Sequence, residues 1–318
     1  MRYELVTDAV GATPLVAVDA LLPDAARAGG VRLFAKVELL GPTGSIKDRT
    51  AKALIDALDR EGRLRPGVRL LEPTSGNTGA ALAMHAAARG IPITLVMPAN
   101  ATEERRQAVR AFGAEIVESP AEEGSNGAVA LARRMAAEDP TFVMPDQYAN
   151  RANPDVHEQT TAPEILADCP EVDVVVAGLG TGGTATGLAR FFAREKPSVA
   201  TWVAEPIPGE KVTGLRTLAD GFTPEVLDDT LLAGRILVSN RESIVAAREL
   251  ARRTGILAGP STGATRAGAR NFPADRAGGS GADRQHRCAR RGRQSNPTSP
   301  GRPYRHAAWK SRHHARVK

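Results

Sequence analysis

Hydrophobic and polar positions alternate along the first 260 residues with two different periods. Short, almost continuously apolar runs are typical of buried strands, and each is followed by a longer Ala-, Arg- and Glu-rich stretch with helical spacing. This alternation predicts a doubly wound α/β fold with mainly parallel sheets. The expected strands are 31–39, 68–73, 93–98, 114–119, 172–180 and 199–206; the expected helices are 45–62, 77–90, 102–113 (with Thr102 placed as its cap), 125–139 and 183–196.

The pattern changes abruptly after GPSTGA (259–264). Residues 264–318 contain no apolar strand and no amphipathic helix of useful length, and they carry 12 Arg, 2 Lys and 2 Asp. Since the whole chain has a net charge of +6, residues 1–263 carry about −6 and the basicity belongs to the tail. A segment of this kind buries too little apolar surface to offset the entropy lost on ordering, so we expect the tail to be disordered.

Composition excludes several classes of protein. Cys169 and Cys288 lie far apart and in no ligand spacing, which disfavours a disulfide framework or a structural metal site. The first residues do not resemble a signal peptide, and no run of about 18 apolar residues predicts a membrane span. We therefore expect a cytoplasmic protein. The tail lacks interleaved aromatic residues, so specific nucleic-acid recognition is not expected, although nonspecific binding is compatible with its charge.

Lys47 lies in GPTGSIKDRTAK (41–52), where the spacing of apolar residues predicts the first turn of a helix. The helix dipole places partial positive charge at this end, so a lysine ammonium is disfavoured there. In the ordinary interpretation Lys47 is a solvated surface lysine, and Asp48 offsets the cost. The alternative is a lysine whose neutral amine is favoured, as a nucleophile that forms an imine requires. Taken alone, the stretch favours the ordinary interpretation.

The stretch EPTSGNTGAA (72–81) forms the turn between an expected strand and the next helix. Its hydroxyl and amide side chains, together with free backbone N–H groups at a helix start, are suited to bind an anion. Ordinary N-capping is the alternative, since Ser, Thr and Asn are the usual caps. More such residues occur here than a cap requires.

A second glycine-rich turn, AGLGTGGTATG (177–187), also joins a strand to a helix. Gly178, Gly180 and Gly183 satisfy GxGxxG and Glu205 ends the next strand, so NAD binding by an oxidoreductase is one interpretation. A single phosphate group, however, needs only backbone N–H groups and nearby hydroxyls. The combination of a phosphate loop, a separate anion loop and an amine-like lysine fits pyridoxal phosphate, whose aldehyde would react with the lysine.

Several motifs in series extend this interpretation. PTGSIKDR, EPTSGNTG, ERRQAVRAFGAEIV, NPDVHEQTTAPEI, GLGTGGT and GILAGPSTGA together resemble the cysteine synthase family of fold-type II pyridoxal-phosphate enzymes. The resemblance runs in order from about Gly11 to Ala264 and is closest to the cysteine synthase B branch, which includes the O-phosphoserine sulfhydrylases. It implies two doubly wound domains: a large cofactor-binding domain from residues 1–39 and 146–263, and a small mobile domain from residues 40–145.

The resemblance also implies roles for individual residues. Lys47 would be the imine-forming and catalytic lysine. A hydroxyl at Ser261 would face the pyridine nitrogen, which favours β-elimination over transamination because a hydroxyl does not stabilise a pyridinium. The remaining cofactor-binding residues would be Asn77, Gly180, Thr181, Gly182, Gly183 and Thr184, and the substrate-binding residues would be Thr74, Ser75, Thr78, Gln147 and Arg216.

Without the resemblance, Ser261 would be interpreted as a helix cap, Gln147 as a polar loop residue and Arg216 as a surface arginine. Arginine nevertheless suits a leaving phosphate, because its planar guanidinium binds phosphate through two hydrogen bonds. His85 and His157 have no partners at metal-ligand spacing, and we interpret both as structural or surface residues.

The implied activity is a β-replacement that makes L-cysteine in amino-acid biosynthesis. Lys47 removes the Cα proton of an activated serine, with O-phosphoserine favoured over O-acetylserine, and phosphate or acetate leaves. A sulfur nucleophile then adds, either sulfide or a thiocarboxylated sulfur-carrier protein. A homodimer is usual for such enzymes.

The resemblance implies a further helix, strand and loop after Ala264 that this chain does not contain. We interpret the switch to an Arg-rich tail as an out-of-frame reading of a GC-rich gene. A missing strand would leave a sheet edge unpaired, and the chain would be poorly folded or weakly active. The alternative function is therefore an inactive, truncated pseudoenzyme with a basic tail that binds nucleic acid nonspecifically. Visible absorbance of a lysine-bound cofactor would separate the cysteine synthase from this remnant and from an NAD enzyme.

The frame hypothesis makes a direct prediction. Resequencing the gene across the codons for residues 263–271 should reveal an inserted or deleted base relative to the recorded sequence. A gene whose frame is intact across these codons contradicts the hypothesis.

Overall fold

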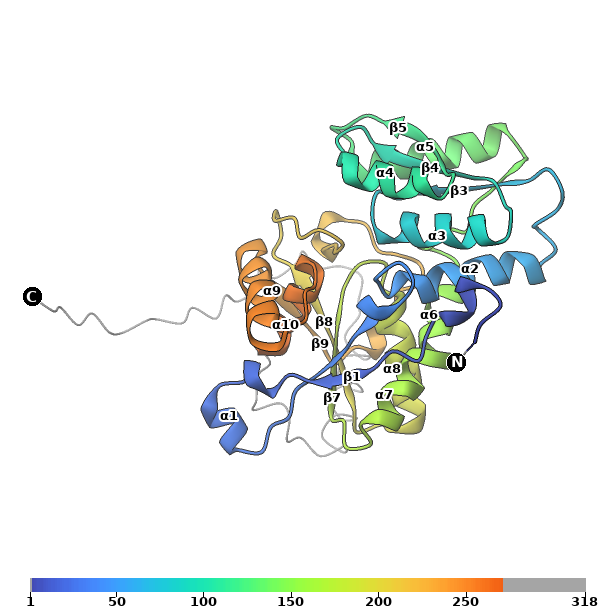
Figure 1. Cartoon of the computed structure of the whole chain (residues 1–318). Helices are drawn as coiled ribbons and strands as arrows, with labels where there is room; N and C mark the ends of the chain where they lie inside the picture. Colours follow the sequence, from blue (N-terminus) through green and yellow to red (C-terminus); the bar gives the residue numbers. More distant parts are fainter. Residues whose placement is uncertain (1, 271–318) are drawn as a thin grey trace, which may run out of the picture. The chain divides into compact units, whose positions relative to one another are not determined.

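The computed structural model describes residues 2–270, so Met1 and residues 271–318 lie outside the described part of the chain. Its strands form three sheets (Figure 1): an antiparallel pair β1-β2, a parallel sheet of order β5-β4-β3-β6, and a parallel sheet of order β7-β8-β9. The strands are β1 Leu15–Ala17, β2 Phe34–Lys36, β3 Arg69–Pro73, β4 Ile93–Pro98, β5 Glu115–Ser119, β6 Phe142–Val143, β7 Val174–Gly178, β8 Ala200–Pro206 and β9 Gly234–Val238.

Helices cover both faces of the two parallel sheets. They are α1 Asp24–Ala28, α2 Lys47–Arg60, α3 Asn77–Ala88, α4 Glu103–Ala111, α5 Gly124–Glu138, α6 Ala152–Val156, α7 Ala162–Asp168, α8 Gly183–Glu195, α9 Asn240–Thr254 and α10 Pro260–Arg270. Short 3₁₀ turns are η1 Val6–Ala9, η2 Asp19–Leu21, η3 Glu38–Leu40, η5 Leu218–Asp220 and η6 Asp229–Leu231, and η4 His157–Thr161 is a turn of π-helix. No helix in the described range is long and apolar enough to cross a bilayer.

Alternating side chains on the central strands supply a separate core on each sheet face. In the first sheet Leu70 and Leu95 pack with residues of α2 and α3, whereas Leu71 and Val96 pack with Ala128 of α5. In the second sheet the same alternation directs Val175 and Ala177 toward α8 and Val174 and Val176 toward α9 and α10, as Figure 1 shows for the helices. The α/β fold with doubly wound, mainly parallel sheets is therefore confirmed.

Most expected elements occur within two residues of their predicted ends, and the first expected strand is the main exception. Only Phe34–Lys36 of residues 31–39 is extended, and Glu38–Leu40 forms a 3₁₀ turn. Thr102 does occupy the cap position of α4, but its side chain makes no capping hydrogen bond. The described residues belong to one compact unit. The division into domains of residues 40–145 and 1–39 plus 146–263 stays a prediction.

The prediction that disorder begins at residue 264 is wrong for its first seven residues. Helix α10 continues to Arg270, with Ala264, Ala267 and Gly268 buried. A Cβ built on Gly268 would lie 3.0 Å from the Ala204 Cβ on β8, so the helix approaches the sheet closely. Small residues at helical spacing suffice to cover this sheet face, although the segment has no large apolar residue there. The rest of the predicted tail, 271–318, lies outside the described residues.

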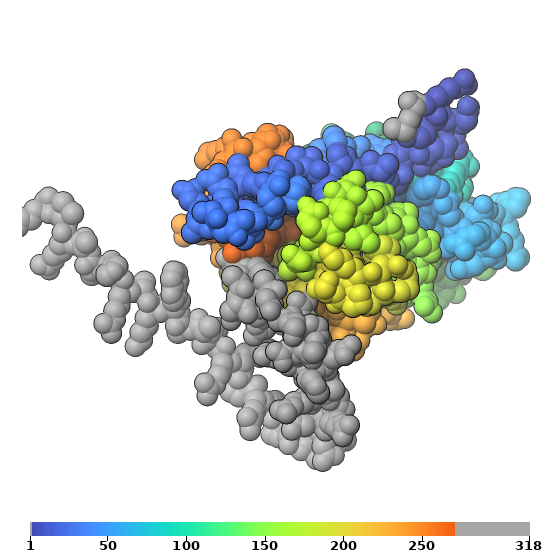
Figure 2. Space-filling model, turned by 90° about the horizontal axis from the view of Figure 1, so that it is seen from below, coloured from blue at the N-terminus to red at the C-terminus, as the bar shows by residue number. Residues whose placement is uncertain are grey.

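A buried ion-pair network joins the N-terminal segment to α2 and α7. Arg49, which is 2 % exposed, donates through Nε to Glu38 (2.9 Å) and through Nη2 to Glu164 (2.7 Å). Lys36 also pairs with Glu164 (2.8 Å), and the Ala12 N–H donates to the same carboxylate (3.0 Å). Figure 2 shows the blue N-terminal segment lying against the green segment that contains α7.

The ion pairs of this network shift the pKa values of Glu164 and Arg49. Burial alone would raise the pKa of Glu164, but the hydrogen bonds from Arg49 and Lys36 outweigh it and lower the pKa from 4.5 to about 2. Burial likewise opposes the charge of Arg49, and the hydrogen bonds that it donates to Glu164 and Glu38 raise its pKa. Glu164 and Arg49 are therefore both charged at neutral pH, and each depends on its partners.

We expect Arg49→Met to reduce the free energy of unfolding by about 3–5 kcal/mol, because two partly buried carboxylates lose their partner. The control Arg63→Met removes an exposed arginine whose pair with Glu61 is 3.5 Å long, and it should change stability by less than about 0.5 kcal/mol. Urea denaturation at neutral pH measures both changes.

The difference in unfolding free energy between wild type and Arg49→Met should also depend on pH. The folded-state pKa of Glu164 is depressed, so its stabilisation is present above pH 4.5 and is lost as the pH falls toward about 2. The stability difference between wild type and Arg49→Met should therefore narrow over that interval. A difference that stays constant would contradict the assignment.

Candidate active site

The loop before α2 is shaped so that the helix begins at Lys47. The Asp48 carboxylate accepts the Thr43 backbone N–H (3.0 Å) and the Thr43 hydroxyl, which folds residues 41–48 into a compact turn. A Cβ at Gly41 would overlap the Asp48 carboxylate, so the turn requires glycine there. Asp48 thus faces its own loop rather than neutralising Lys47, and the ordinary interpretation of the lysine loses its support.

Lys47 is in a setting that favours the neutral amine. Burial lowers the pKa of the Lys47 amine, and the negative charge of Glu38 only partly opposes this shift. Its place as first residue of α2 adds the unfavourable helix dipole. Among the described residues no side-chain hydrogen bond or ion pair involves Nζ. The lysine is therefore poised as a nucleophile and proton carrier.

The first glycine loop is joined to Gln147 from another part of the chain. Thr78 is 4 % exposed, and its hydroxyl donates to Gln147 Oε1 (2.8 Å). Thr74 accepts the Gly76 N–H through its own hydroxyl (3.3 Å), and Thr74 and Ser75 are half-buried. Asn77 begins α3 and is exposed. The structure therefore brings Thr78 and Gln147 together, while Asn77 faces solvent.

Glu72, which sequence reasoning did not single out, lies directly before this loop. It is fully buried at the end of β3 and accepts the backbone N–H groups of Asp146 (3.0 Å) and Gln147 (3.2 Å). Burial raises the pKa of Glu72 to about 8, although both N–H groups act in the opposite direction. A carboxyl residue at a strand end beside a predicted loop was the available signal.

The second glycine loop is closely packed from outside. Gly182 has a φ of +86°, and a Cβ at Gly180 would lie 3.1 Å from the Gly214 carbonyl oxygen. A Cβ at Gly183 would overlap the Asn153 side-chain amide. Thr181 accepts the Gly183 N–H (3.3 Å) at the start of α8. The loop therefore presents backbone N–H groups and the hydroxyls of Thr181 and Thr184 at the positive end of a helix, which suits a phosphate.

His157 links this loop to α2. It is fully buried, its Nε2 lies 3.2 Å from the Thr184 hydroxyl and 3.4 Å from the Thr50 hydroxyl, and its Nδ1 lies 3.0 Å from Thr161 Oγ1. Burial and the nearby charges of Lys47 and Arg49 lower the pKa of His157 to about 3, so the ring is neutral. The alternative of a surface residue is wrong, and the structural interpretation is supported.

His85 is likewise buried rather than exposed. Its Nε2 lies 3.1 Å from the Asp48 carbonyl oxygen, and burial lowers its pKa to about 4. It supports the first turn of α2 from the side of α3. Both histidines therefore pack against the helix that carries Lys47.

Arg216 and Ser261 come to the same edge of the second sheet. The backbone N–H of Arg216 donates to the Leu179 carbonyl oxygen beside the second glycine loop (2.8 Å). Ser261 Oγ lies 3.6 Å from the place that a Cβ would take at Gly214, whose carbonyl oxygen in turn contacts Gly180. Ser261 is the second residue of α10, so it is not the cap that its sequence context alone suggested.

The Arg216 guanidinium is held by rings. It lies 5.1 Å from the centre of the Tyr148 ring and 4.8 Å from that of Phe222, and these two rings pack edge to face. Asn126 Oδ1 of α5 accepts from both Nη atoms at 3.4 and 3.5 Å. The guanidinium keeps a fixed orientation and has no carboxylate partner among the described residues.

Glu205, the acidic residue of the NAD alternative, is already engaged. It is 2 % exposed, accepts the Leu218 N–H (3.0 Å) and pairs with Arg235 (3.2 Å). A carboxylate in this setting is not free to bind a ribose hydroxyl, so the feature on which dinucleotide binding depends has a structural role here.

Comparison with known proteins identifies the family. Residues 6–283 match the family described as "Pyridoxal-phosphate dependent enzyme". The chain belongs to this family. It is 39 % identical over 268 residues to a "Probable cysteine synthase" of Bacillus subtilis (strain 168), covering 81 % of this chain and 85 % of that protein. The family match, over residues 6–283, continues past Ala264, so the resemblance extends further than the sequence motifs indicated.

Solved structures agree with this assignment. The crystal structure of O-ureido-L-serine synthase is 34 % identical, with a TM-score of 0.80 over 86 % of this chain and 87 % of that chain. A lysine-to-alanine mutant of that enzyme with O-ureido-L-serine bound gives a TM-score of 0.79 over 86 % of each chain. The predicted membership of the cysteine synthase family, the fold type and the pyridoxal-phosphate cofactor are confirmed.

The residues of this chain fit that cofactor. The desolvated Lys47 amine suits an aldehyde, and the glycine loop at the start of α8 suits a phosphate, with Asn153 filling the space that a Cβ at Gly183 would need. The roles of the individual predicted residues stay predictions.

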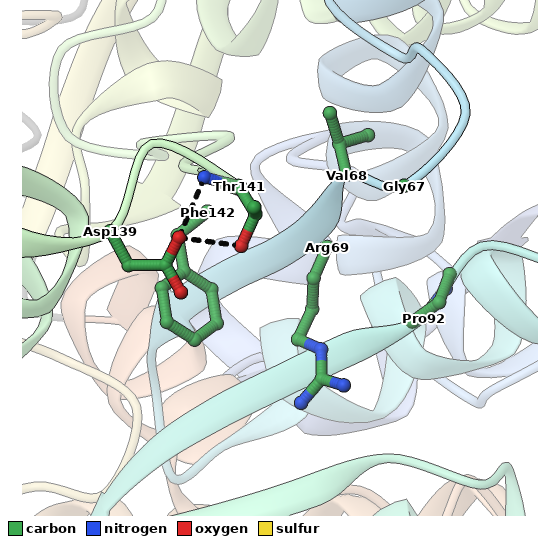
Figure 3. A pocket seen from close by; sticks show the side chains of 7 residues that line it. All are labelled: Gly67, Val68, Arg69, Pro92, Asp139, Thr141 and Phe142. Carbon is green, nitrogen blue, oxygen red and sulfur yellow. Dashed lines mark hydrogen bonds between the residues drawn. The ribbon is translucent and has the colours of Figure 1, made fainter.

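The small pocket in Figure 3 is a separate feature. It lies where β3, β4 and β6 begin, and its residues are Gly67, Val68, Arg69, Pro92, Asp139, Thr141 and Phe142. Its charged groups are partnered, since Asp139 accepts the Thr141 N–H (2.9 Å) and hydroxyl (2.7 Å), and Arg69 pairs with Glu115. Both glycine loops, by contrast, follow the carboxyl ends of strands, where parallel sheets bind their ligands.

The packing around Gly183 gives a prediction. Gly183→Ala should displace the Asn153 amide and lower the affinity for pyridoxal phosphate by about tenfold or more, because a buried amide loses its hydrogen bonds. Absorbance titration of the cofactor-free protein with pyridoxal phosphate measures this. The control Gly29→Ala places its Cβ in ordinary contact at 3.4 Å and should bind normally. Equal affinity of the two variants would contradict the prediction.

Proposed function

We propose that the protein makes L-cysteine by β-replacement, from an activated serine and a sulfur donor. The observation that carries the proposal is a desolvated lysine amine at the start of α2, a helix that contacts the phosphate-type loop through Thr50, His157 and Thr184. Similarity to a probable cysteine synthase supports the same reaction class. Bound pyridoxal phosphate supplies the electron sink that acidifies the substrate Cα proton.

The residues around the cofactor have separate roles in the reaction. Lys47, held with a lowered pKa, takes the Cα proton and returns one at the end of the reaction. Thr78 and Gln147, together with the N–H groups at the start of α3, orient the substrate carboxylate. The Ser261 hydroxyl offers a neutral partner for a ring nitrogen, which favours elimination. Thr74 and Ser75 form the half-buried part of the loop that would close over the substrate, and the exposed Asn77 beside them would contact the cofactor.

O-Phosphoserine is the favoured substrate, followed by O-acetylserine. The argument depends on Arg216, whose guanidinium is oriented by Tyr148 and Phe222 and has only the amide oxygen of Asn126 as polar side-chain partner in the described residues. Two parallel N–H groups in a fixed orientation bind a leaving phosphate better than a neutral acetyl group. We further propose sulfide or a thiocarboxylated carrier protein as sulfur donor, a homodimeric assembly and a cytoplasmic location.

A second candidate follows from the structural comparison. O-Ureido-L-serine synthase matches this fold with a TM-score of 0.80 and 34 % identity. If this chain resembles it in substrate as well as fold, the nucleophile would be an oxygen that carries a ureido group, and the same residues would act on the serine part. Product analysis with the two nucleophiles separates these functions.

We expect Arg216→Ala to lower kcat/KM for O-phosphoserine by about a hundredfold and for O-acetylserine by no more than about threefold, since a charge-assisted contact is lost only with phosphate. The control Arg194→Ala removes an arginine that also lies over a ring, that of Phe191 at 5.9 Å, outside the site. It should affect neither substrate. Cysteine formation measures both rates.

Three outcomes would contradict the proposal. Equal losses with both substrates would remove Arg216 from phosphate recognition. Absence of cysteine formation by cofactor-loaded wild-type protein would overturn the β-replacement with sulfide. Failure of borohydride to fix the cofactor on Lys47 would remove that lysine from its role.

A further inference from the structure

The turn that carries Gln147 has an unusual backbone. Asp146, the residue before it, has a φ of +49°, in the left-handed region that few residues other than glycine, asparagine and aspartate adopt. Such a conformation persists when the surrounding structure fixes it. The turn must therefore be held by contacts from outside.

Glu72 supplies these contacts. Its Oε2 accepts the Asp146 N–H (3.0 Å) and its Oε1 accepts the Gln147 N–H (3.2 Å), so each carboxylate oxygen fixes one of two consecutive backbone groups. Glu72 has no exposed surface, and β3 anchors it between β4 and β6. Asp146 is the charged group that acts electrostatically on Glu72. Its carboxylate cannot donate a hydrogen bond to Glu72, so it does not replace the two backbone N–H donors.

Gln147 in turn contacts the first glycine loop directly and the second glycine loop through Asn153. Its Oε1 accepts the Thr78 hydroxyl (2.8 Å), and its backbone carbonyl accepts Asn153 Nδ2 (2.7 Å). The same Nδ2 donates to Thr181 Oγ1 in the second loop (2.9 Å). Gln147 and Asn153 are 3 % and 1 % exposed, so these bonds are sheltered from water.

We propose that Glu72 is a positioning residue that holds Gln147 between the substrate-carboxylate loop and the phosphate loop. The inference rests on the proposed function in one respect, namely that Thr78 and Gln147 contact the substrate carboxylate. Glu72 acts through the backbone of the turn and does not itself touch substrate. Its loss should weaken binding of the amino-acid substrate more than it slows the chemistry of bound substrate.

The test compares Glu72→Gln, Gln147→Ala and the double variant in the cofactor-loaded protein. A glutamine has the shape of glutamate but turns an amide NH₂ toward one of the two N–H donors, so it cannot accept both. Work at about pH 9 keeps wild-type Glu72 ionised, above its pKa of about 8. The probe is O-phosphoserine, and the readouts are the change in cofactor absorbance on binding and the separate values of KM and kcat.

Glu72→Gln is expected to raise the half-saturating O-phosphoserine concentration and KM by about tenfold, with kcat changed by less than about threefold. The double variant should be no worse than Gln147→Ala alone, because both changes remove the same contact. The control Thr94→Val lies on β4 beside β3, and Thr94 Oγ1 has no hydrogen-bond partner in the described structure. It should leave all values unchanged.

An independent measurement does not require turnover. The backbone amide protons of Asp146 and Gln147 should be protected from hydrogen exchange in the wild type. They should exchange at least about tenfold faster in Glu72→Gln. Unchanged exchange, an unchanged half-saturating concentration or multiplicative losses in the double variant would overturn the inference. If wild-type protein binds neither O-phosphoserine nor O-acetylserine, the proposed function fails, and the exchange rates alone decide whether Glu72 holds the turn.

Discussion

Desolvation of one amino group is the constraint on which the site depends. Lys47 occupies the positive end of α2, and burial lowers its pKa while no carboxylate pairs with it in the described structure. A protein retains so unfavourable a placement only if neighbouring elements fix the helix start. Asp48 folds the preceding loop, His85 packs from α3, and Arg49 joins the same first turn to Glu38 and Glu164.

A chain of buried hydrogen bonds then relates the two loops to each other. Glu72 holds a strained turn, the turn presents Gln147 to Thr78, and Asn153 joins Gln147 to Thr181. These residues come from distant parts of the sequence, and each bond is short and sheltered. One set of buried contacts therefore joins the two glycine loops, and the exposed Asn77 lies outside it.

Periodicity was sufficient to predict the alternation of strands and helices, because parallel sheets bury continuous apolar runs. It failed at residues 31–39, where Glu38 leaves the strand to pair with Arg49, a contact with a residue on another element. The motifs around Lys47 and Gly180 indicated the family and its cofactor, since glycine turns at helix starts have a local signature. Asn153 and His157 act through long-range contacts, and no local pattern distinguishes them from ordinary core residues. Glu72 had only its place at the end of a strand, beside a predicted loop, as a local signal.

Helix α10 shows that small residues alone can form a buried contact with a sheet. Its contact with the second sheet is made by Ala264, Ala267 and Gly268, so any stretch that supplies small side chains at this interval closes the sheet equally well. The amino-acid composition of the chain can therefore change within a helix without altering the helical backbone. In this protein the helical backbone continues to Arg270, although residues 260–270 include no large apolar residue.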